Sequence, residues 1–565
     1  MKNLFSFYSV IAISCFLLGT RLYYTDWKAP MPLKLTTWDA LGYYLYLPAK
    51  EIYKDQTSKN WLDSLDKTYQ LSGGELYQLS HLPNGNYAGK YLRGVSILQY
   101  PFFKLADLYA RHQNKYPADG FSPPYQFALA YGLLIYIILA LFLLRNILLN
   151  FFSDTVVSWT LIILLIGTNA IQYIAVEAGQ SHGYIFPLYV LILYLSMQWH
   201  RKPKLWIGFL IGLVFGLACI SRPTEAVMLF IPLLWDLHDN TRWKAKWDLL
   251  KRQPVHLIFA LLGCCLAISP QLIYWKTVTG HWVYDVGSKW DFLNPHWRVL
   301  FGPEKGWFVY TPLTLLFVFG LFRLKGFAFR TAVLTFCLLN IYIIIAWHTW
   351  RYGGSYSTRA LVQSYPVFAI PLAAGLQILL TRFRYLVPAI LVIFMGINLF
   401  QIWQYNKTIL HYDAMNWNYY RSIFLNPSPT PQAYSLMDDG EPKPELSAFK
   451  KYILLQDSVP QFIPDGELLN TEFSVRKEET FWVHCQADLL HQEGLWDQYL
   501  CMELASEKER RRIRLFRPQA KEHQWNTFEA WFTFTATSDL QHLRWYSTSY
   551  PCEARNLKVV LYSKL

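Results

Sequence analysis

Long apolar runs, separated by short polar segments, dominate the first 405 residues of the chain. Several runs extend over about 18 to 22 residues, which is enough for a helix to cross the hydrocarbon core of a bilayer. Two runs, 205–220 and 225–237, are short, so a re-entrant pair is an alternative there. We predict an α-helical multi-pass membrane protein with about eleven transmembrane helices. The expected spans are residues 3–22, 125–148, 156–176, 183–199, 205–220, 225–237, 255–275, 307–323, 329–347, 360–380 and 385–403.

The pattern changes after about residue 405. Long apolar runs disappear, and apolar and polar residues alternate in "FEAWFTFTATS" and "NLKVVLYS". Alternation with a period of two is typical of β-strands with one buried face. We therefore expect residues 1–405 to form the transmembrane body and residues 406–565 to form a β-rich domain. The chain shows no internal repeat, which disfavours a transporter built from duplicated halves.

Composition supports the membrane interpretation. The chain is 53% hydrophobic and 18% aromatic, and only 16% of its residues are charged. Soluble domains are usually about 25% charged. The formal net charge of +13 fits basic cytoplasmic loops and contacts with anionic lipids, and no nucleic-acid-binding module is present in the sequence.

The positive-inside rule gives an orientation. With the N-terminus in the cytoplasm, most inner loops are basic, as in "HRKPKLW", "RLKGFAFR" and "TRFRY". The first segment, "MKNLFSFYSVIAISCFLLGT", lacks a small-x-small cleavage site, so we expect an uncleaved span. A long loop over about residues 23–124 and the β-rich domain would then be extracytoplasmic. Short loops and an undivided chain suit a bacterial cytoplasmic membrane.

The eight cysteines do not have metal-binding spacings. Five lie in apolar runs, where cysteine is a small hydrophobe. Cys485, Cys501 and Cys552 lie in the C-terminal region, where one disulfide would be consistent with an extracytoplasmic location. We expect no cofactor, and the sequence does not support a divalent metal site.

Ionisable residues are costly inside a membrane, so their positions carry information. In this chain they gather at the expected outer ends of different spans, and a helical bundle would direct them toward one cavity. Such a cavity suits an anionic ligand with a tail in lipid. The residues are Asp39, Lys90, Arg93, Glu177, His182, Arg222, Glu225, His281, Asp285, Glu304, Lys305, His348, Arg351 and Arg359.

Each of these residues also has a structural interpretation. Asp39 could cap a helix that begins near Ala40. Arg222 precedes a proline and could extend to lipid head groups. His182 could be a hydrogen-bonded structural histidine, and Glu177 could pair with a nearby cation. Arg359 could anchor a helix end after the turn "GGSYST". Their common location favours a functional site.

These segments resemble the GT-C superfamily of integral-membrane glycosyltransferases, in particular the branch of protein O-mannosyltransferases and lipid A aminoarabinose transferases. Members carry an acidic residue just after the first span, which matches Asp39 in "TTWDALGYYLYLPAK". The segments "GKYLRGVSILQYPFFKLADLY", "GPEKGWFVYTPLTLL" and "YGGSYSTRALVQSYPVFAIPLA" also resemble members, over about residues 1–405. Ala40 stands where the mannosyltransferases often have a second acid, so their sugar specificity does not transfer.

The resemblance implies a polyprenyl-phosphate sugar as donor, a lipid, glycan or protein as acceptor, and inversion at the anomeric carbon. Asp39 would be the base, and Glu177 would bind sugar hydroxyls or assist as a second acid. Arg351 and Arg359 are the first choices for the phosphate, because guanidinium groups bind phosphate in a forked geometry. The further candidates for the phosphate are Lys90, Arg222, Lys305, His182 and His348.

Two other functions stay open at this point. A transporter or flippase for a lipid-linked glycan would carry ionisable groups at mid-membrane depth and usually a repeat. A membrane scaffold that presents the β-rich domain would leave the gathered charges unexplained. Removing the β-rich domain would abolish the function of a scaffold but not necessarily that of an enzyme.

Overall fold

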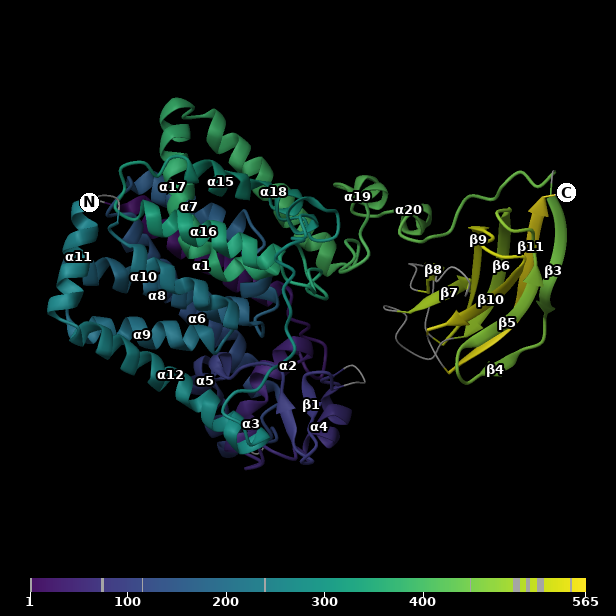
Figure 1. Cartoon of the computed structure of the whole chain (residues 1–565), viewed down its shortest axis with the longest axis horizontal. Helices are drawn as coiled ribbons and strands as arrows, with labels where there is room; N and C mark the ends of the chain where they lie inside the picture. Colours follow the sequence, from purple (N-terminus) through teal and green to yellow (C-terminus); the bar gives the residue numbers. More distant parts are fainter. Residues whose placement is uncertain are drawn as a thin grey trace. The chain divides into compact units, whose positions relative to one another are not determined.

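The computed structural model of the protein describes residues 3–72, 76–113, 115–237, 240–447, 449–490, 498–504, 509–515, 523–548 and 551–564. The chain divides into two compact units, Met1–Lys407 and Thr408–Leu565. The first unit is mostly helical and the second is built mainly of β-strands (Figure 1). The prediction of a helical body followed by a C-terminal β-sheet domain is confirmed.

The first unit contains long helices joined by short ones. Its α-helices are α1 Leu4–Tyr23, α2 Trp38–Tyr44, α3 Tyr46–Glu51, α4 Leu62–Tyr69, α5 Gly94–His112, α6 Pro123–Leu148, α7 Asp154–Ile166, α8 Ser181–Arg201, α9 Leu205–Cys219, α10 Phe230–Leu234, α11 Asn240–Arg252, α12 Val255–Thr279, α13 Arg298–Phe301, α14 Trp307–Tyr310, α15 Leu315–Leu321, α16 Arg330–Ile345, α17 Tyr365–Arg382 and α18 Leu386–Asn406. Tighter or wider turns are η1 Gln172–Val176, η2 Pro223–Leu229, η3 Pro312–Thr314 and η4 Arg359–Ser364.

Among the described residues, 5 segments are long and apolar enough to cross a membrane, namely α1, α6, η4 with α17, α12 and α18. Shorter apolar helices lie between them, including α7, α9 and α16. The protein is therefore a membrane protein by the length and composition of its helices. The number of eleven spans stays a prediction.

Some expected spans are not continuous α-helices. The span expected at 307–323 is divided into α14, η3 and α15, because Pro312 has no N–H to continue the helical ladder. The span expected at 225–237 begins as the 3₁₀ turn η2 after Pro223 and becomes α10 only at Phe230. The span expected at 156–176 ends its α-helix at Ile166 and finishes in η1, a π-helical turn.

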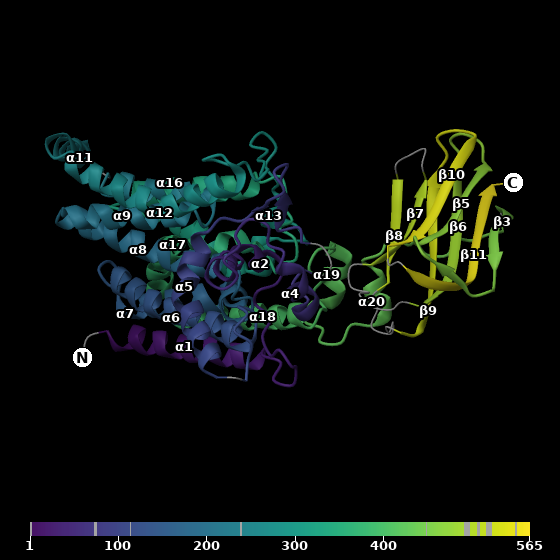
Figure 2. The same cartoon turned by 90° about the horizontal axis from the view of Figure 1, so that it is seen from below.

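The two ends of the helical unit are named here by residues that lie at them. At one end, which we call the basic end, Arg145 donates to the carbonyl of Asn3 at 2.6 Å and Arg201 donates to Asn150 at 2.8 Å. Helix α1 begins at this end and runs along α7 (Figure 2). At the other end of α1, Arg21 donates to the carbonyls of Val176 and Ile174 at 3.0 and 3.2 Å. We call this the Asp39 end, because α2 follows α1 there.

The segment between α1 and α6 folds over the Asp39 end. It holds α2 to α5 and a hairpin of β1 Leu79–His81 and β2 Tyr87–Gly89. The hairpin turn docks on the end of α12, where Asn84 and Asn86 donate to the carbonyl of Val278 at 3.0 and 2.8 Å. Tyr46 of α3 and Tyr274 of α12 pack edge to face at 4.8 Å. The loop is thereby fixed to the helices.

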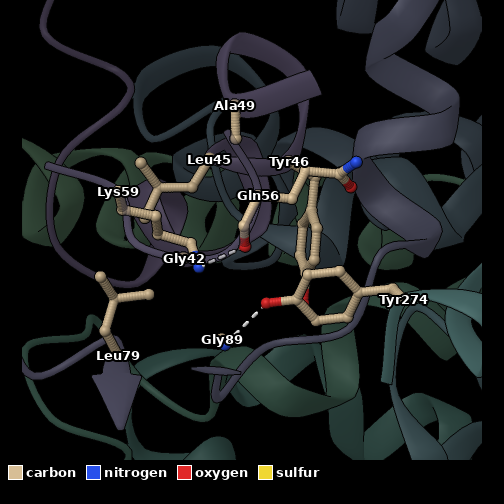
Figure 3. A pocket seen from close by; sticks show the side chains of 9 residues that line it. All are labelled: Gly42, Leu45, Tyr46, Ala49, Gln56, Lys59, Leu79, Gly89 and Tyr274. Carbon is tan, nitrogen blue, oxygen red and sulfur yellow. Dashed lines mark hydrogen bonds between the residues drawn. The ribbon is translucent and has the colours of Figure 1, made fainter. Parts of the chain in front are cut away.

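A small cavity lies between α2, α3, the hairpin and α12 (Figure 3). Its volume of about 10 Å³ suits one water molecule. Lys59 lies on its wall and donates to the carbonyls of Gln56, at 2.8 Å, and Tyr87. Burial lowers the pKa of Lys59 to about 8. Because this ammonium is held by backbone carbonyls, the cavity is part of the packing of the loop.

The second unit is a sandwich of two antiparallel sheets preceded by α19 Trp417–Ile423 and α20 Pro431–Ser435. One sheet has the order β5-β10-β7-β8, and the other has the order β3-β11-β6-β9 with β4 pairing β11. Side chains of both sheets share one core, for example Phe481 and Trp545. The strands are β3 Phe449–Asp457, β4 Gln461–Ile463, β5 Glu467–Ser474, β6 Thr480–Leu490, β7 Tyr499–Leu504, β8 Glu509–Arg514, β9 Trp525–Thr535, β10 Leu540–Ser547 and β11 Cys552–Lys564.

The two alternating segments of the sequence form β9 and β11. In the described sheet β11 lies between β3 and β6, and β9 is at the edge beside β6. In β9, Phe528, Ala530, Phe532 and Phe534 point into the core, as a period of two predicts. Cys485, Cys501 and Cys552 are all buried and all free, so none of them forms a disulfide in this structure.

Candidate active site

Asp39 lies in the first turn of α2, one residue inside the helix. Thr37 is the N-cap residue, so Asp39 is not the cap that the structural interpretation required. Trp38 has a left-handed backbone with φ of 51° and is 55% exposed. This conformation is unfavourable for a bulky residue, and it persists only where the surroundings hold it. The backbone of Trp38 is held by Leu71, whose carbonyl accepts from its N–H at 3.3 Å, and by Gln78, which donates to its carbonyl at 3.0 Å.

Three side chains donate hydrogen bonds to the Asp39 carboxylate. The hydroxyls of Tyr77 and Tyr91 donate to Oδ1 at 2.8 and 2.6 Å. Arg359 donates from Nη2 to Oδ2 at 2.5 Å and forms an ion pair with it. The two tyrosines come from the segment between α1 and α6, whereas Arg359 begins η4 in front of α17. The site therefore joins the first and the last parts of the helical unit.

Opposing effects act on the pKa of Asp39. Burial alone would raise it, but the Arg359 guanidinium and the hydroxyls of Tyr91 and Tyr77 outweigh burial and hold the pKa below its ordinary value. Asp39 is therefore ionised at neutral pH.

If Asp39 must be ionised to act, activity should be lost only as the pH falls through its lowered pKa. Tyr91→Phe removes one donor to the charged form, so the pKa of Asp39 should rise and the acid limb should move to higher pH. The dependence of kcat on pH checks this. Tyr87→Phe changes a phenol of the same loop and should leave the acid limb in place; an unshifted limb in Tyr91→Phe would contradict the role of that hydroxyl.

Because Gly42 has no side chain, the ring of Tyr91 can lie against α2 and its hydroxyl can contact Asp39. A Cβ at Gly42 would lie 2.1 Å from the ring of Tyr91, which is far inside contact distance. The carbonyl of Tyr91 is also fixed, because the hydroxyl of Tyr46 donates to it. Tyr91 is thus held by α2 through its ring and by α3 through its carbonyl.

We expect Gly42→Ala to push the Tyr91 ring away from Asp39. A displacement of about 1 Å in a catalytic group costs roughly 10²-fold in rate, so kcat should fall by about that factor. Steady-state kinetics of the purified variant would measure this. Gly19→Ala is a matched control, since a Cβ at Gly19 has open space around it. Full activity of Gly42→Ala would show that the position of Tyr91 does not matter.

Glu177 follows the π-helical turn η1, a type of turn that is frequent at functional sites. Gln172 donates to its Oε1 at 2.9 Å and also to Asn406 at 3.2 Å, and Asn406 donates back to Gln172 at 2.8 Å. Burial raises the pKa of Glu177, although Gln172, Arg359 and Lys305 act in the opposite direction. Gly179 brings this turn against α2, because a Cβ there would lie 2.7 Å from that of Ala40.

Lys305 and Arg359 supply positive charge near Glu177, and Arg359 also pairs with Asp39. Lys305 is fully buried and donates to the carbonyls of Gly353 and Ser355 at 2.8 and 3.1 Å. These carbonyls belong to the loop that leads to Arg359, so the ammonium fixes the path of that loop. Both cations act electrostatically on Glu177.

Arg222 and His182 form a second polar group beside the first. Arg222 Nη1 lies 3.2 Å from His182 Nδ1, and the same ring nitrogen lies 2.7 Å from Oε1 of Gln363. Gln363 also donates to Glu225 at 3.0 Å, and Tyr189 donates to the other oxygen of Glu225. Gln363 lies in η4, the turn that Arg359 begins, so the two groups are adjacent.

The structure does not bring every candidate into this site. Lys90, Arg351 and His348 have exposed side chains. The Arg351 guanidinium lies over the ring of its neighbour Trp350, 5.3 Å from the centroid. Asp39, Glu177, Arg359, Lys305, Arg222 and His182 are the candidates that come together.

Sequence reasoning missed Tyr77, Tyr91 and Gln363. Tyrosines are frequent at membrane interfaces, so the two phenols resembled interfacial anchors. One signal was present, because Tyr91 adjoins Lys90 in the segment "GKYLRG". Charge indicates Lys90 of that segment as a candidate, whereas the phenol of Tyr91 carries no charge.

No family model matches the chain, and no curated protein matches it in sequence. Solved structures do resemble it. The archaeal oligosaccharyltransferase AglB from Archaeoglobus fulgidus, solved with an inhibitory peptide and a dolichol-phosphate, has a TM-score of 0.43 and 12% identity, and the match covers 77% of this chain and 59% of AglB. ArnT from Cupriavidus metallidurans has a TM-score of 0.39 and 12% identity, with 65% of this chain and 59% of ArnT covered.

Arabinosyltransferase EmbB from Mycobacterium smegmatis has a TM-score of 0.41 and 10% identity, with 98% of this chain and 64% of EmbB covered. In each case the match spans less than two thirds of the similar protein. The chemistry of the site in this chain therefore rests on the residues around Asp39.

Proposed function

We propose that the protein transfers a sugar from a polyprenyl-phosphate donor to an acceptor hydroxyl at the outer face of the bacterial cytoplasmic membrane. The observation that carries this proposal is the ionised Asp39, held by Arg359 and two tyrosines at the end of a bundle of apolar helices. A carboxylate beside a guanidinium provides a base for a hydroxyl and a partner for a phosphate in one place.

The reaction needs a proton acceptor and a stabilised leaving group. The acceptor hydroxyl gives its proton to Asp39 as its oxygen forms a bond to the anomeric carbon. The bond from that carbon to the phosphate oxygen breaks, and its electron pair leaves with the polyprenyl phosphate. A single displacement of this kind inverts the anomeric centre. A positioned base typically contributes about 10²–10⁴-fold.

The cations of the site suit the leaving phosphate. Arg359 can present two N–H groups to phosphate oxygens, and Lys305 and Arg222 add positive charge nearby. Glu177, whose pKa burial raises, would bind sugar hydroxyls or assist as a second acid. The donor is expected to be a lipid, because apolar side chains such as Leu261 and Leu266 of α12 are exposed along the bundle.

The orientation of the protein is part of the proposal. Arginines of the basic end, such as Arg145 and Arg201, fit the cytoplasmic side. The Asp39 end and the second unit would then face outward. The acceptor is a lipid, a glycan or a protein, and membrane lipids surround the bundle.

A transporter or flippase for a lipid-linked glycan is the second candidate. The connected group of Arg222, His182, Gln363 and Glu225 favours it, because such polar networks inside a bundle also occur along translocation routes. A transporter would move the lipid-linked sugar without breaking its bond to phosphate.

Transfer of radiolabelled sugar from a panel of polyprenyl-phosphate sugars tests the proposal. Purified protein in lipid would be given each donor with a membrane extract as the source of acceptor. Label in a product that no longer contains the polyprenyl phosphate is the expected result. Movement of intact donor across vesicle membranes, with no transfer from any donor, would overturn the proposal in favour of the flippase.

A further inference from the structure

Arg359 has two roles that compete with each other. It is the cation in direct contact with Asp39, and its side chain is only 11% exposed. Under the proposed function it also binds the phosphate of the donor, with Lys305 and Arg222 in the same cluster of charges. In the structure its Nη2 is committed to Asp39 Oδ2, the oxygen that the tyrosines do not contact.

We propose that Arg359 is exchanged between Asp39 and the phosphate of an incoming polyprenyl-phosphate ligand. The exchange uncovers Oδ2 of Asp39, so the base is available only after the phosphate has bound. This inference rests on the proposed function. In it, Arg359 is the residue through which donor binding makes Asp39 available as the base.

The two oxygens of Asp39 are held in different ways, which makes the exchange feasible. Oδ1 keeps its hydrogen bonds from Tyr77 and Tyr91 when Arg359 leaves. The carboxylate therefore stays in position and stays partly satisfied while Oδ2 becomes free. A phosphate offers the guanidinium a bidentate partner, whereas Asp39 Oδ2 takes Nη2 alone in this structure.

The exchange predicts an order of binding. Without the phosphate, Oδ2 is covered, and an acceptor hydroxyl has no free oxygen to accept its proton. The donor would therefore bind before the acceptor. The ion pair also lowers the apparent affinity for the ligand, since only the fraction of molecules in which Arg359 has left Asp39 can bind phosphate with full affinity.

The test is the affinity of polyprenyl monophosphate, without a sugar, for the full chain in lipid nanodiscs. In Asp39→Asn the guanidinium is no longer held, so the ligand should bind at least about tenfold tighter than to the wild type. Polyprenol, which lacks the phosphate, should show no such gain. Inorganic phosphate distinguishes a lipid ligand from a free anion: tightening with both probes assigns the exchange to phosphate alone, and tightening with the lipid only assigns it to the lipid-borne phosphate.

Removing a negative charge would also tighten anion binding without any exchange. The double variant Asp39→Asn with Arg359→Gln separates the two explanations. If the exchange operates, Asp39→Asn should gain less than about twofold in the Arg359→Gln background. An equal gain in both backgrounds would overturn the inference. Asp63→Asn, an exposed acid of α4 in the same loop, is the matched control and should bind like the wild type.

Folding and function are monitored independently. Thermal unfolding of each variant in the same nanodiscs shows whether the bundle is intact, and Asp39→Ser provides a second neutral variant if Asp39→Asn does not fold. Wild-type transfer of sugar combined with unchanged affinity in Asp39→Asn would refute the exchange and leave the proposed function standing. A wild type that binds no polyprenyl phosphate would refute both.

Discussion

Asp39→Asn should reduce the rate of sugar transfer by about 10²–10⁴-fold, the usual contribution of a positioned base. An amide has nearly the shape of a carboxylate, so its oxygen can still accept from Tyr77 and Tyr91. It cannot take a proton from the acceptor hydroxyl at neutral pH. Single-turnover assays with saturating donor measure the chemical step and exclude effects on binding.

Asp63→Asn is the control for this experiment, because it removes one exposed carboxylate from the same loop. It should transfer sugar at the wild-type rate. If Asp39→Asn were as active as the wild type, Asp39 would lose the role of base. Glu177→Gln would then be the next variant to assay, since Glu177 is the other acid near Arg359.

Arg359→Gln should have the second large effect, a loss of about 10²–10³-fold in kcat. The variant lacks the charge that stabilises the leaving phosphate. It also removes the cation that lowers the pKa of Asp39, so that pKa should rise. The acid limb of the pH profile should therefore move to higher pH, because a higher pH is then needed to ionise the base. The loss of kcat at neutral pH measures the first effect. The dependence of kcat/KM on pH, which reports the free enzyme in which Arg359 pairs with Asp39, measures the second.

Arg298→Gln is the matched control, since this exposed arginine pairs with Glu304 at 3.6 Å. It should change neither kcat nor the acid limb. A lower kcat in Arg359→Gln with an unmoved acid limb would mean that Arg359 acts on the phosphate but does not set the ionisation of Asp39. Rescue by Arg359→Lys would show that charge alone is sufficient.

The sequence predicted the layout of the fold well, because bilayer helices and half-buried strands leave strong periodic signals. The alternation of Phe528, Ala530, Phe532 and Phe534 specified the inner face of β9. Helix breaks were less predictable. The break at Pro312 follows from the proline itself, whereas an apolar run does not indicate the π-helical turn at Gln172.

The candidate site was predicted only in part. Asp39 and Arg359 stood out as charges at the ends of apolar runs, and the structure joins them. Tyr77 and Tyr91 did not stand out, because their contacts to Asp39 span 38 and 52 residues of loop whose path the sequence does not specify. Arg351 stood out by charge as Arg359 did, yet its side chain is exposed. Charge indicates candidates, but the path of the loops decides which of them meet.

The separation of 320 residues between Asp39 and Arg359 has a consequence for biosynthesis. At about 5–20 residues per second, a ribosome needs roughly 15 to 60 s to add Arg359 after Asp39. For most of this interval the growing chain contains the acid and both tyrosines, but it has no Arg359 guanidinium to complete the ion pair. A nascent or truncated chain that ends before α17 would therefore be unable to process a donor, and catalytic competence would arise only when insertion of the helical unit is nearly complete.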